Sequence, residues 1–227
     1  MKEFYKKEIA FERVIFFSDA IVAIAITLLA LELKVSSPSE QHLTFAALLA
    51  PWHKYLAFIL SFTSISGFWR THHNFFLYIR KLDERMLAIN IFWLFFIVIL
   101  PFSTSLLSDH FGDTPAIFMY SMNIFLVSIA QNSIWDYADS KDDFMNREHL
   151  DDERRKDFRR MLNLDMLNGL VAVIVSFFMP KLAFFLLFFK LPLFLIIAFV
   201  IARKRRAEVK QKRGETVKHK RGGGRSS

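Results

Sequence analysis

Long apolar runs dominate the pattern of this chain, and they are too long to be the buried stripe of a soluble helix. About 20 consecutive apolar residues are needed to cross the hydrocarbon core of a bilayer. Six runs meet this requirement, and the last two are separated by little more than Pro180 and Lys181, which predicts a helical hairpin. We therefore predict an all-α integral membrane protein with spans at 14–33, 55–79, 87–107, 117–138, 161–179 and 182–202.

Composition supports this class. Of the 227 residues, 53% are hydrophobic and 27 are Phe, whereas soluble domains lie nearer 45–50% apolar. We expect a six-span domain over 1–202 and a disordered, basic cytoplasmic tail over 203–227, because that tail is highly charged and poor in apolar residues. The absence of cysteine excludes thiolate catalysis, disulfides and cysteine metal sites.

Charge between the spans predicts the orientation. Most of the 30 Lys and Arg residues fall in segments 1–13, 80–86, 139–160 and 203–227, while loops 36–52 and 108–116 contain none. Basic loops remain on the cytoplasmic side, and six spans return both termini to the same side. Both termini are therefore predicted to be cytoplasmic. The net charge of +8 fits juxtamembrane segments beside anionic lipid better than a nucleic-acid site.

The first span carries the least expected residue, Asp19, with Arg13 and Glu32 near its two ends. Ionisable groups inside a bilayer are costly and usually mark a functional site. The alternative is that Asp19 serves packing alone, by capping a neighbouring helix or pairing with a basic residue. For either role a buried carboxylate needs a partner, and we expect Asp19 to reach another helix.

Helix geometry divides this span into two faces. At about 100° per residue, a stripe lies within roughly 60° of one direction, formed by Ile24, Thr27, Leu28 and Leu31. Ser18 and Asp19 point about 120° and 140° away from that stripe. The stripe alone says little, because apolar stripes in membrane helices usually face lipid or neighbouring helices.

The run from Arg13 to Asp19 is an R-x-x-x-F-S-D motif, followed directly by AIAITLLALEL. With six spans, the FWRTHHNFF stretch and the proline-broken final hairpin, the chain resembles prokaryotic potassium channels related to lysosomal transmembrane protein 175. The resemblance extends to about Arg203. It implies a potassium-selective, leak-type channel in the bacterial plasma membrane, a homotetramer whose first helices surround the pore. Its partners would be its own copies, potassium ions and lipid, and no cofactor is implied.

The resemblance also implies roles for single residues. Ile24 matches the narrowest ring of the pore, Leu28 and Leu31 match further apolar rings, and Thr27 matches a hydroxyl layer implicated in selectivity. A structural polar network on the cytoplasmic side would contain Arg13, Phe17, Ser18 and Asp19.

The second span contributes His72 and His73, which point about 100° apart and cannot bind one metal ion in the i,i+4 manner of a zinc helix. We expect one of them to join the Ser18/Asp19 network, and no metal site. Lys190, in the last span, either snorkels, pairs with a group such as Asp165, or marks a wrong boundary.

Other functions remain as alternatives. A secondary or proton-coupled transporter would use Asp19 and the region of His72 and His73, although such carriers usually show internal repeats and broken helices, and neither is evident. A membrane scaffold without transport activity is a third reading. No phosphate loop, nucleophile elbow or pair of catalytic carboxylates is present, so no enzyme is expected.

Overall fold

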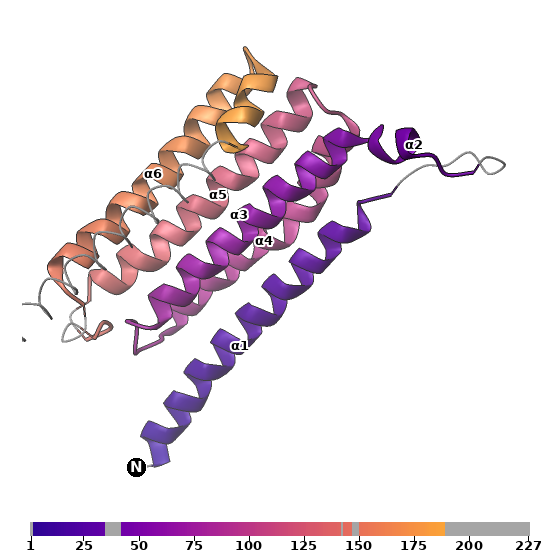
Figure 1. Cartoon of the computed structure of the whole chain (residues 1–227). Helices are drawn as coiled ribbons and strands as arrows, with labels where there is room; N and C mark the ends of the chain where they lie inside the picture. The colour runs from indigo at the N-terminus through magenta and orange to yellow at the C-terminus, as the bar shows by residue number, and fades with distance from the viewer. Residues whose placement is uncertain (1, 35–41, 142, 147–149, 189–227) are drawn as a thin grey trace, which may run out of the picture. The chain divides into compact units, whose positions relative to one another are not determined.

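The computed structural model describes residues 2–34, 42–141, 143–146 and 150–188. The tail over 203–227, Lys190 and most of the predicted sixth span lie outside these residues. Figure 1 shows the described elements, which are α1 (Lys2–Leu31), α2 (Phe45–Leu49), α3 (Trp52–Phe76), α4 (Glu84–Asp109), α5 (Thr114–Asp139) and α6 (Asp152–Ser176). Residues 180–188 are helical as well. The predicted all-α fold is confirmed for this part of the chain.

The helices follow the predicted spans closely, with three differences. α1 begins at Lys2 rather than at 14. α6 begins at Asp152 rather than at 161, and Asp152 and Glu153 in its first turn favour a helix start there. The loop 36–52 contains the short helix α2, which Thr44 caps by accepting a hydrogen bond from the Ala47 N–H at 3.1 Å.

Three segments among the described residues are long and apolar enough to cross a membrane, namely Ala10–Leu31, Glu84–Asp109 and Thr114–Asp139. α3 and α6 have the length of a span but carry more polar and charged residues. The six-span count therefore stays a prediction.

The helices pack in a defined order. α1 contacts α3 and α4, α4 packs along α5, and α5 along α6. Phe11 of α1 lies 5.7 Å from Phe76 near the end of α3, whereas Glu32, just past the end of α1, meets Ser105 near the end of α4. α1 therefore runs antiparallel to α3 and parallel to α4.

Close packing and buried polar contacts hold this bundle together. Gly169 of α6 touches α5 so closely that an added Cβ would lie 2.9 Å from the Cα of Phe125. Between α3, α4 and α5, the Thr104 hydroxyl donates to Ser61 at 2.7 Å, and the Ser61 hydroxyl donates to Tyr120 at 3.1 Å. Small residues and interhelical hydrogen bonds are the usual means of helix association in lipid.

The two predicted cytoplasmic loops bind each other. Ile79 forms an antiparallel bridge with Met145, and the Arg80 N–H donates to the Phe144 carbonyl at 2.9 Å. The basic segments on either side of α4 and α5 thus meet at one end of the bundle, as the loop charges require.

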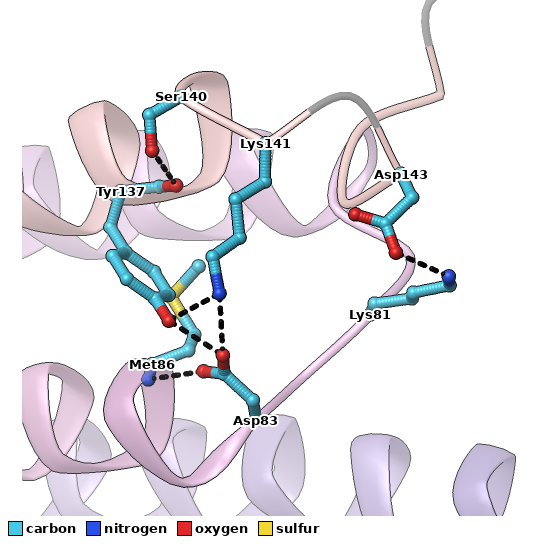
Figure 2. A network of polar contacts seen from close by, with 7 residues as sticks. All are labelled: Lys81, Asp83, Met86, Tyr137, Ser140, Lys141 and Asp143. Atoms are coloured by element: carbon cyan, nitrogen blue, oxygen red, sulfur yellow. Dashed lines mark hydrogen bonds and ion pairs between the residues drawn. The ribbon is translucent and has the colours of Figure 1, made fainter.

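Three side chains join the start of α4 to the end of α5 (Figure 2), and we call Asp83, Tyr137 and Lys141 the Asp83 clamp. Asp83 caps α4 by accepting from the Met86 N–H at 2.8 Å. Its other oxygen accepts from the Tyr137 hydroxyl at 2.6 Å and from Lys141 Nζ at 2.8 Å. Partial desolvation raises the pKa of Asp83. The hydrogen bonds from Lys141, Tyr137 and Met86 together outweigh this effect and lower the pKa to about 2. The hydrogen bond to Asp83 raises the pKa of Lys141.

We expect the Asp83 clamp to be fully formed from weakly acidic to weakly basic pH. The lowered pKa of Asp83 contributes stability that is present above about pH 4 and is lost as the pH falls towards 2. The raised pKa of Lys141 contributes stability that is lost only as the pH rises above its ordinary range. Asp83→Asn should therefore lower the melting temperature of the detergent-solubilised protein by a few degrees at pH 7. The gap to the wild type should close near pH 2.

Asp143→Asn is the matched control, because Asp143 pairs with Lys81 at 2.7 Å on a more exposed surface. Exposed pairs contribute little to stability, so this variant should melt close to the wild type. An Asp83→Asn variant that melts like Asp143→Asn at pH 7 would contradict a stabilising clamp.

Candidate pore helix

α1 has one buried face, which fixes its rotation against the bundle. Ser18, Val22, Ala25 and Leu29 are at most 2% exposed and recur at helical spacing. They lie on the side that meets α3 and α4. The residues predicted to line a pore must therefore lie on the remaining surface.

That remaining surface carries the predicted stripe. Ile24, Leu28 and Leu31 are 58%, 41% and 63% exposed, and Thr27 is exposed between them. Only 22% of the apolar window of α1 is buried, against 50% and 61% for α4 and α5. Lipid, water or another copy of the chain must cover a surface of this kind.

The hydroxyl of Thr27 has a fixed orientation. It donates to the Ile24 carbonyl one turn earlier, at 2.8 Å. Because its proton is used within the helix, the oxygen presents lone pairs outwards. A ring of such oxygens is able to accept a cation but not to donate to an anion.

A buried hydrogen-bonded chain anchors the opposite face. The Ser18 hydroxyl donates to the Val14 carbonyl at 2.8 Å and accepts from the Asn90 amide at 2.9 Å. The carbonyl oxygen of Asn90 lies 2.8 Å from His72 Nε2. That oxygen can only accept, so the proton of His72 must sit on Nε2. We call Ser18, Asn90 and His72 the anchor network.

The ring of His72 is also packed. It stacks on Trp93 with centroids 4.4 Å apart and an angle of 11° between the planes. His72 and Asn90 are buried, at 1% and 0% exposure. The anchor network therefore joins α1, α3 and α4 in the interior of the protomer.

Asp19 uses a separate partner. Trp69 on α3 donates its Nε1–H to Asp19 at 2.8 Å, and the exposed His73 ring stacks on Trp69 with centroids 5.6 Å apart. The carboxylate thus reaches a neighbouring helix, through an indole rather than a basic side chain.

Two predicted members of the network are exposed in the protomer. Arg13 is exposed, and Phe17 is 56% exposed. Phe17 precedes Ile24 by seven residues, which places it within about 20° of Ile24 around the helix. We therefore assign Phe17 to the exposed stripe.

Sequence reasoning did not identify Trp69 and Trp93 as contact partners, whereas a hydrogen bond from Asn90 to another helix was to be expected. A signal existed for Asn90, which is a lone amide in an apolar span, and such amides often bond across helices. No feature of the sequence shows which helix an amide will meet. In the described part of the chain, no group of three or more His, Asp or Glu is placed to hold a metal ion.

Known proteins similar in sequence to this chain are named as ion channels. Residues 13–101 match the family described as endosomal/lysosomal potassium channel TMEM175. A potassium channel of Chamaesiphon minutus is 37% identical over 131 residues, which are 56% of this chain and 64% of that protein. The endosomal/lysosomal proton channel TMEM175 of Gallus gallus is 36% identical over 148 residues, covering 60% of this chain and 30% of the relative.

A solved structure extends the similarity beyond the matched sequence. The crystal structure of a lysosomal potassium-selective channel TMEM175 homologue from Chamaesiphon minutus superposes with a TM-score of 0.68 at 29% identity. The match covers 82% of this chain and 97% of that one. By sequence, the matched part spans less than two thirds of the bacterial relatives, 62% of the one from Streptomyces collinus.

The described helices form an all-α bundle whose fold matches that of a solved potassium-selective channel. Residues 13–101 are similar to the TMEM175 family, and the resemblance predicted from the first span is confirmed over that part of the chain. The family consists of ion channels rather than enzymes.

Proposed function

We propose that this chain forms a potassium-conducting channel, a homotetramer in which four copies of α1 surround the pore. One observation carries the proposal. On α1, the side opposite the anchor network is an exposed stripe of Ile24, Thr27, Leu28 and Leu31. The bacterial relatives named potassium channels support the choice of ion.

The stripe explains how such a pore would close. Four copies of Ile24 make a narrow apolar ring, with Leu28 and Leu31 making further rings towards the end of α1. An ion cannot pass a dry apolar constriction without losing its hydration shell. The pore conducts when the rings move apart far enough to admit water.

Thr27 supplies the selectivity layer. Its lone pairs point away from the helix because its proton is held by the Ile24 carbonyl. One hydroxyl oxygen per subunit replaces only part of the hydration shell, so the preference for potassium over sodium should be modest.

The proposal also includes the membrane location, the orientation of the chain and the contacts that hold α1. The predicted location is a bacterial plasma membrane, with both termini in the cytoplasm and the Asp83 clamp on the cytoplasmic side. Asp19 and the anchor network would hold α1 in the rotation that keeps the stripe towards the pore. The permeant ion is the ligand, and no cofactor takes part.

Reconstitution tests this function. Purified full-length protein in liposomes with a potassium gradient should release potassium, and in planar bilayers it should give unitary currents whose reversal potential follows the gradient. Thr27→Val keeps the shape of the side chain but removes its oxygen. It should keep these currents and shift the reversal potential, under opposed potassium and sodium, towards zero.

Thr63→Val is the control for Thr27→Val. Thr63 on α3 also bonds a carbonyl of its own helix, that of Ile59, but it lies outside the stripe. The Thr63→Val variant should leave the selectivity for potassium over sodium unchanged. Equal loss of selectivity in both variants would remove Thr27 from the selectivity layer, and a wild type without unitary currents would refute the channel.

A secondary or proton-coupled transporter is the alternative function; the animal relatives named proton channels bear on which ion passes and not on a carrier mechanism. Asp19 and His72, which it would use, are both engaged in hydrogen bonds. Slow, saturable flux without unitary currents would favour this alternative.

A further inference from the structure

The segment 43–52, which contains α2, exposes a large amount of apolar surface. Five large apolar side chains in it are between 37% and 86% exposed, and we call them the α2 patch: Leu43, Phe45, Leu48, Leu49 and Trp52. No residue of α2 is buried against the rest of the described chain. Exposed apolar patches usually mark contact with another protein or with a membrane.

The same segment carries no charge. It reads LTFAALLAPW, so its polar side chains are Thr44 and Trp52 alone. Thr44 is already engaged as the cap of α2, where it accepts from the Ala47 N–H. Removing such a surface from water is favourable in proportion to its apolar area. We therefore expect the α2 patch to be covered in the native protein.

The contacts between α3 and the end of α4 show at which level of the membrane the α2 patch lies. Trp52 begins α3, and its ring centroid lies 5.4 Å from that of Phe111, just past the end of α4. Lys54 pairs with Asp109, the last residue of α4, at 2.9 Å. Because α4 is long and apolar enough to cross a membrane, its end lies where hydrocarbon meets headgroups. The α2 patch leads directly into this level.

A hydrogen bond keeps α2 beside the start of α3. Tyr55, in the first turn of α3, donates its hydroxyl proton to the Leu48 carbonyl at 2.6 Å. α2 therefore stays close to the end of the span. Trp and Tyr are enriched at the boundary of headgroups and hydrocarbon, where an apolar ring and a polar tip are both accommodated. Trp52 and Tyr55 fit this boundary.

We propose that the α2 patch lies in the interfacial layer of the leaflet opposite the cytoplasm and binds phospholipid there. This inference rests on the membrane orientation in the proposed function, but not on the ion that passes. Interfacial segments bury their apolar side chains where headgroups meet acyl chains. The patch would attach the chain to the membrane at a point outside its spanning helices.

Phospholipid fits the α2 patch better than a second copy of the chain does. Protein interfaces carry about one hydrogen bond per 100–200 Å², whereas the segment 43–52 offers little besides the indole N–H of Trp52. Acyl chains form no hydrogen bonds, so they leave no partner unsatisfied on this surface. The single indole N–H is able to reach a headgroup.

Spin labelling of the full-length protein tests this placement. The chain has no cysteine, so a nitroxide can be attached at one chosen position. Phe45→Cys and Leu49→Cys each place the label on the α2 patch, at positions 86% and 66% exposed, where little packing within the protomer is lost. In liposomes of phosphatidylcholine and phosphatidylglycerol, the label should collide often with molecular oxygen, which concentrates in lipid. It should collide rarely with a charged nickel chelate, which stays in water.

Asp113→Cys is the matched control, because Asp113 is exposed at the same end of the bundle but faces His110 in a polar loop. The ratio of oxygen to nickel collisions should be several-fold higher at positions 45 and 49 than at 113. Equal ratios would place the α2 patch in water and overturn the inference. Labels shielded from both reagents would show that protein covers the patch, which would overturn it as well.

Potassium flux from the same liposomes keeps the two proposals separate. Labels in contact with lipid in a protein that gives no flux would refute the channel and support the placement of the α2 patch. Flux from a protein whose labels meet the nickel chelate would have the opposite meaning.

Discussion

Ile24→Asn is expected to raise the potassium conductance at least about tenfold, since each 1.4 kcal/mol removed from a barrier gives a factor of ten in rate. The barrier in the proposed pore is the cost of stripping water from an ion at a dry ring. Ile24 is 58% exposed in the protomer, so its side chain is free to form that ring. Four amides at this level would hold water, and the ion would keep its hydration shell.

The same change should weaken selectivity. A hydrated ion passing a wetted ring has less need of the Thr27 oxygens, so potassium and sodium should become harder to distinguish. Unitary currents under opposed potassium and sodium measure both effects, the first as conductance and the second as a reversal potential nearer zero.

Ile26→Asn provides the comparison. Ile26 lies two residues along α1, about 200° around the helix from Ile24, and is half-buried. The Ile26→Asn variant makes the same chemical change in the same helix but away from the stripe, so its conductance should not rise. Wild-type currents in Ile24→Asn, or an equal gain in Ile26→Asn, would remove Ile24 from the constriction.

The rotation of α1 shows how far sequence reasoning reaches. Counting residues at helical pitch separated Ile24 from Ser18 correctly, because the geometry of one helix is local. In the protomer Ile24 is exposed and Ser18 is buried, and the role of the stripe as a pore lining stays a prediction. Phe17 shows the limit of assigning roles from a motif, because the resemblance placed it in the network whereas helical pitch puts it on the exposed side of α1, near Ile24.

Contacts between helices were harder to predict. The partner of Asp19 was expected on another helix, but nothing in the sequence singled out Trp69. Asn90 is 72 residues from Ser18, and a contact over such a distance depends on the packing of whole helices. Hydropathy alone put the start of the fifth span at 161, although the mixed charges of 139–160 allow a longer helix, and α6 begins at Asp152. Its first turns are held by ion pairs from Arg155 and Arg159 to the buried carboxylate of Asp139, at 2.6 and 3.1 Å, and hydropathy does not register such pairs.

In the proposed channel the two faces of α1 have different tasks. The anchor network is buried and polar, and it joins three helices of one protomer, so it resists rotation of α1. The stripe is apolar and makes few contacts within the protomer, so it is free to meet copies of itself. A change in the anchor network should therefore reach the pore even though the ion does not touch it.

Asn90→Ala is the strongest test of that coupling. It leaves the Nε2–H of His72 unpaired in the interior and removes the donor to Ser18. Each buried polar group left without a partner costs about 1–3 kcal/mol, so the melting temperature should fall by several degrees. With α1 less firmly held, the reversal potential under opposed potassium and sodium should also move towards zero.

Asn123→Ala separates this coupling from a general loss of stability. Asn123 is also a buried amide, 4% exposed, and lies 3.1 Å from the Ser103 hydroxyl between α4 and α5, away from α1. Its truncation should lower the melting temperature comparably and leave selectivity as in the wild type. If both variants lose selectivity to the same degree, the effect follows from stability alone. If Asn90→Ala melts lower yet keeps full selectivity, the anchor network stabilises the protomer without setting the rotation of α1 at the pore.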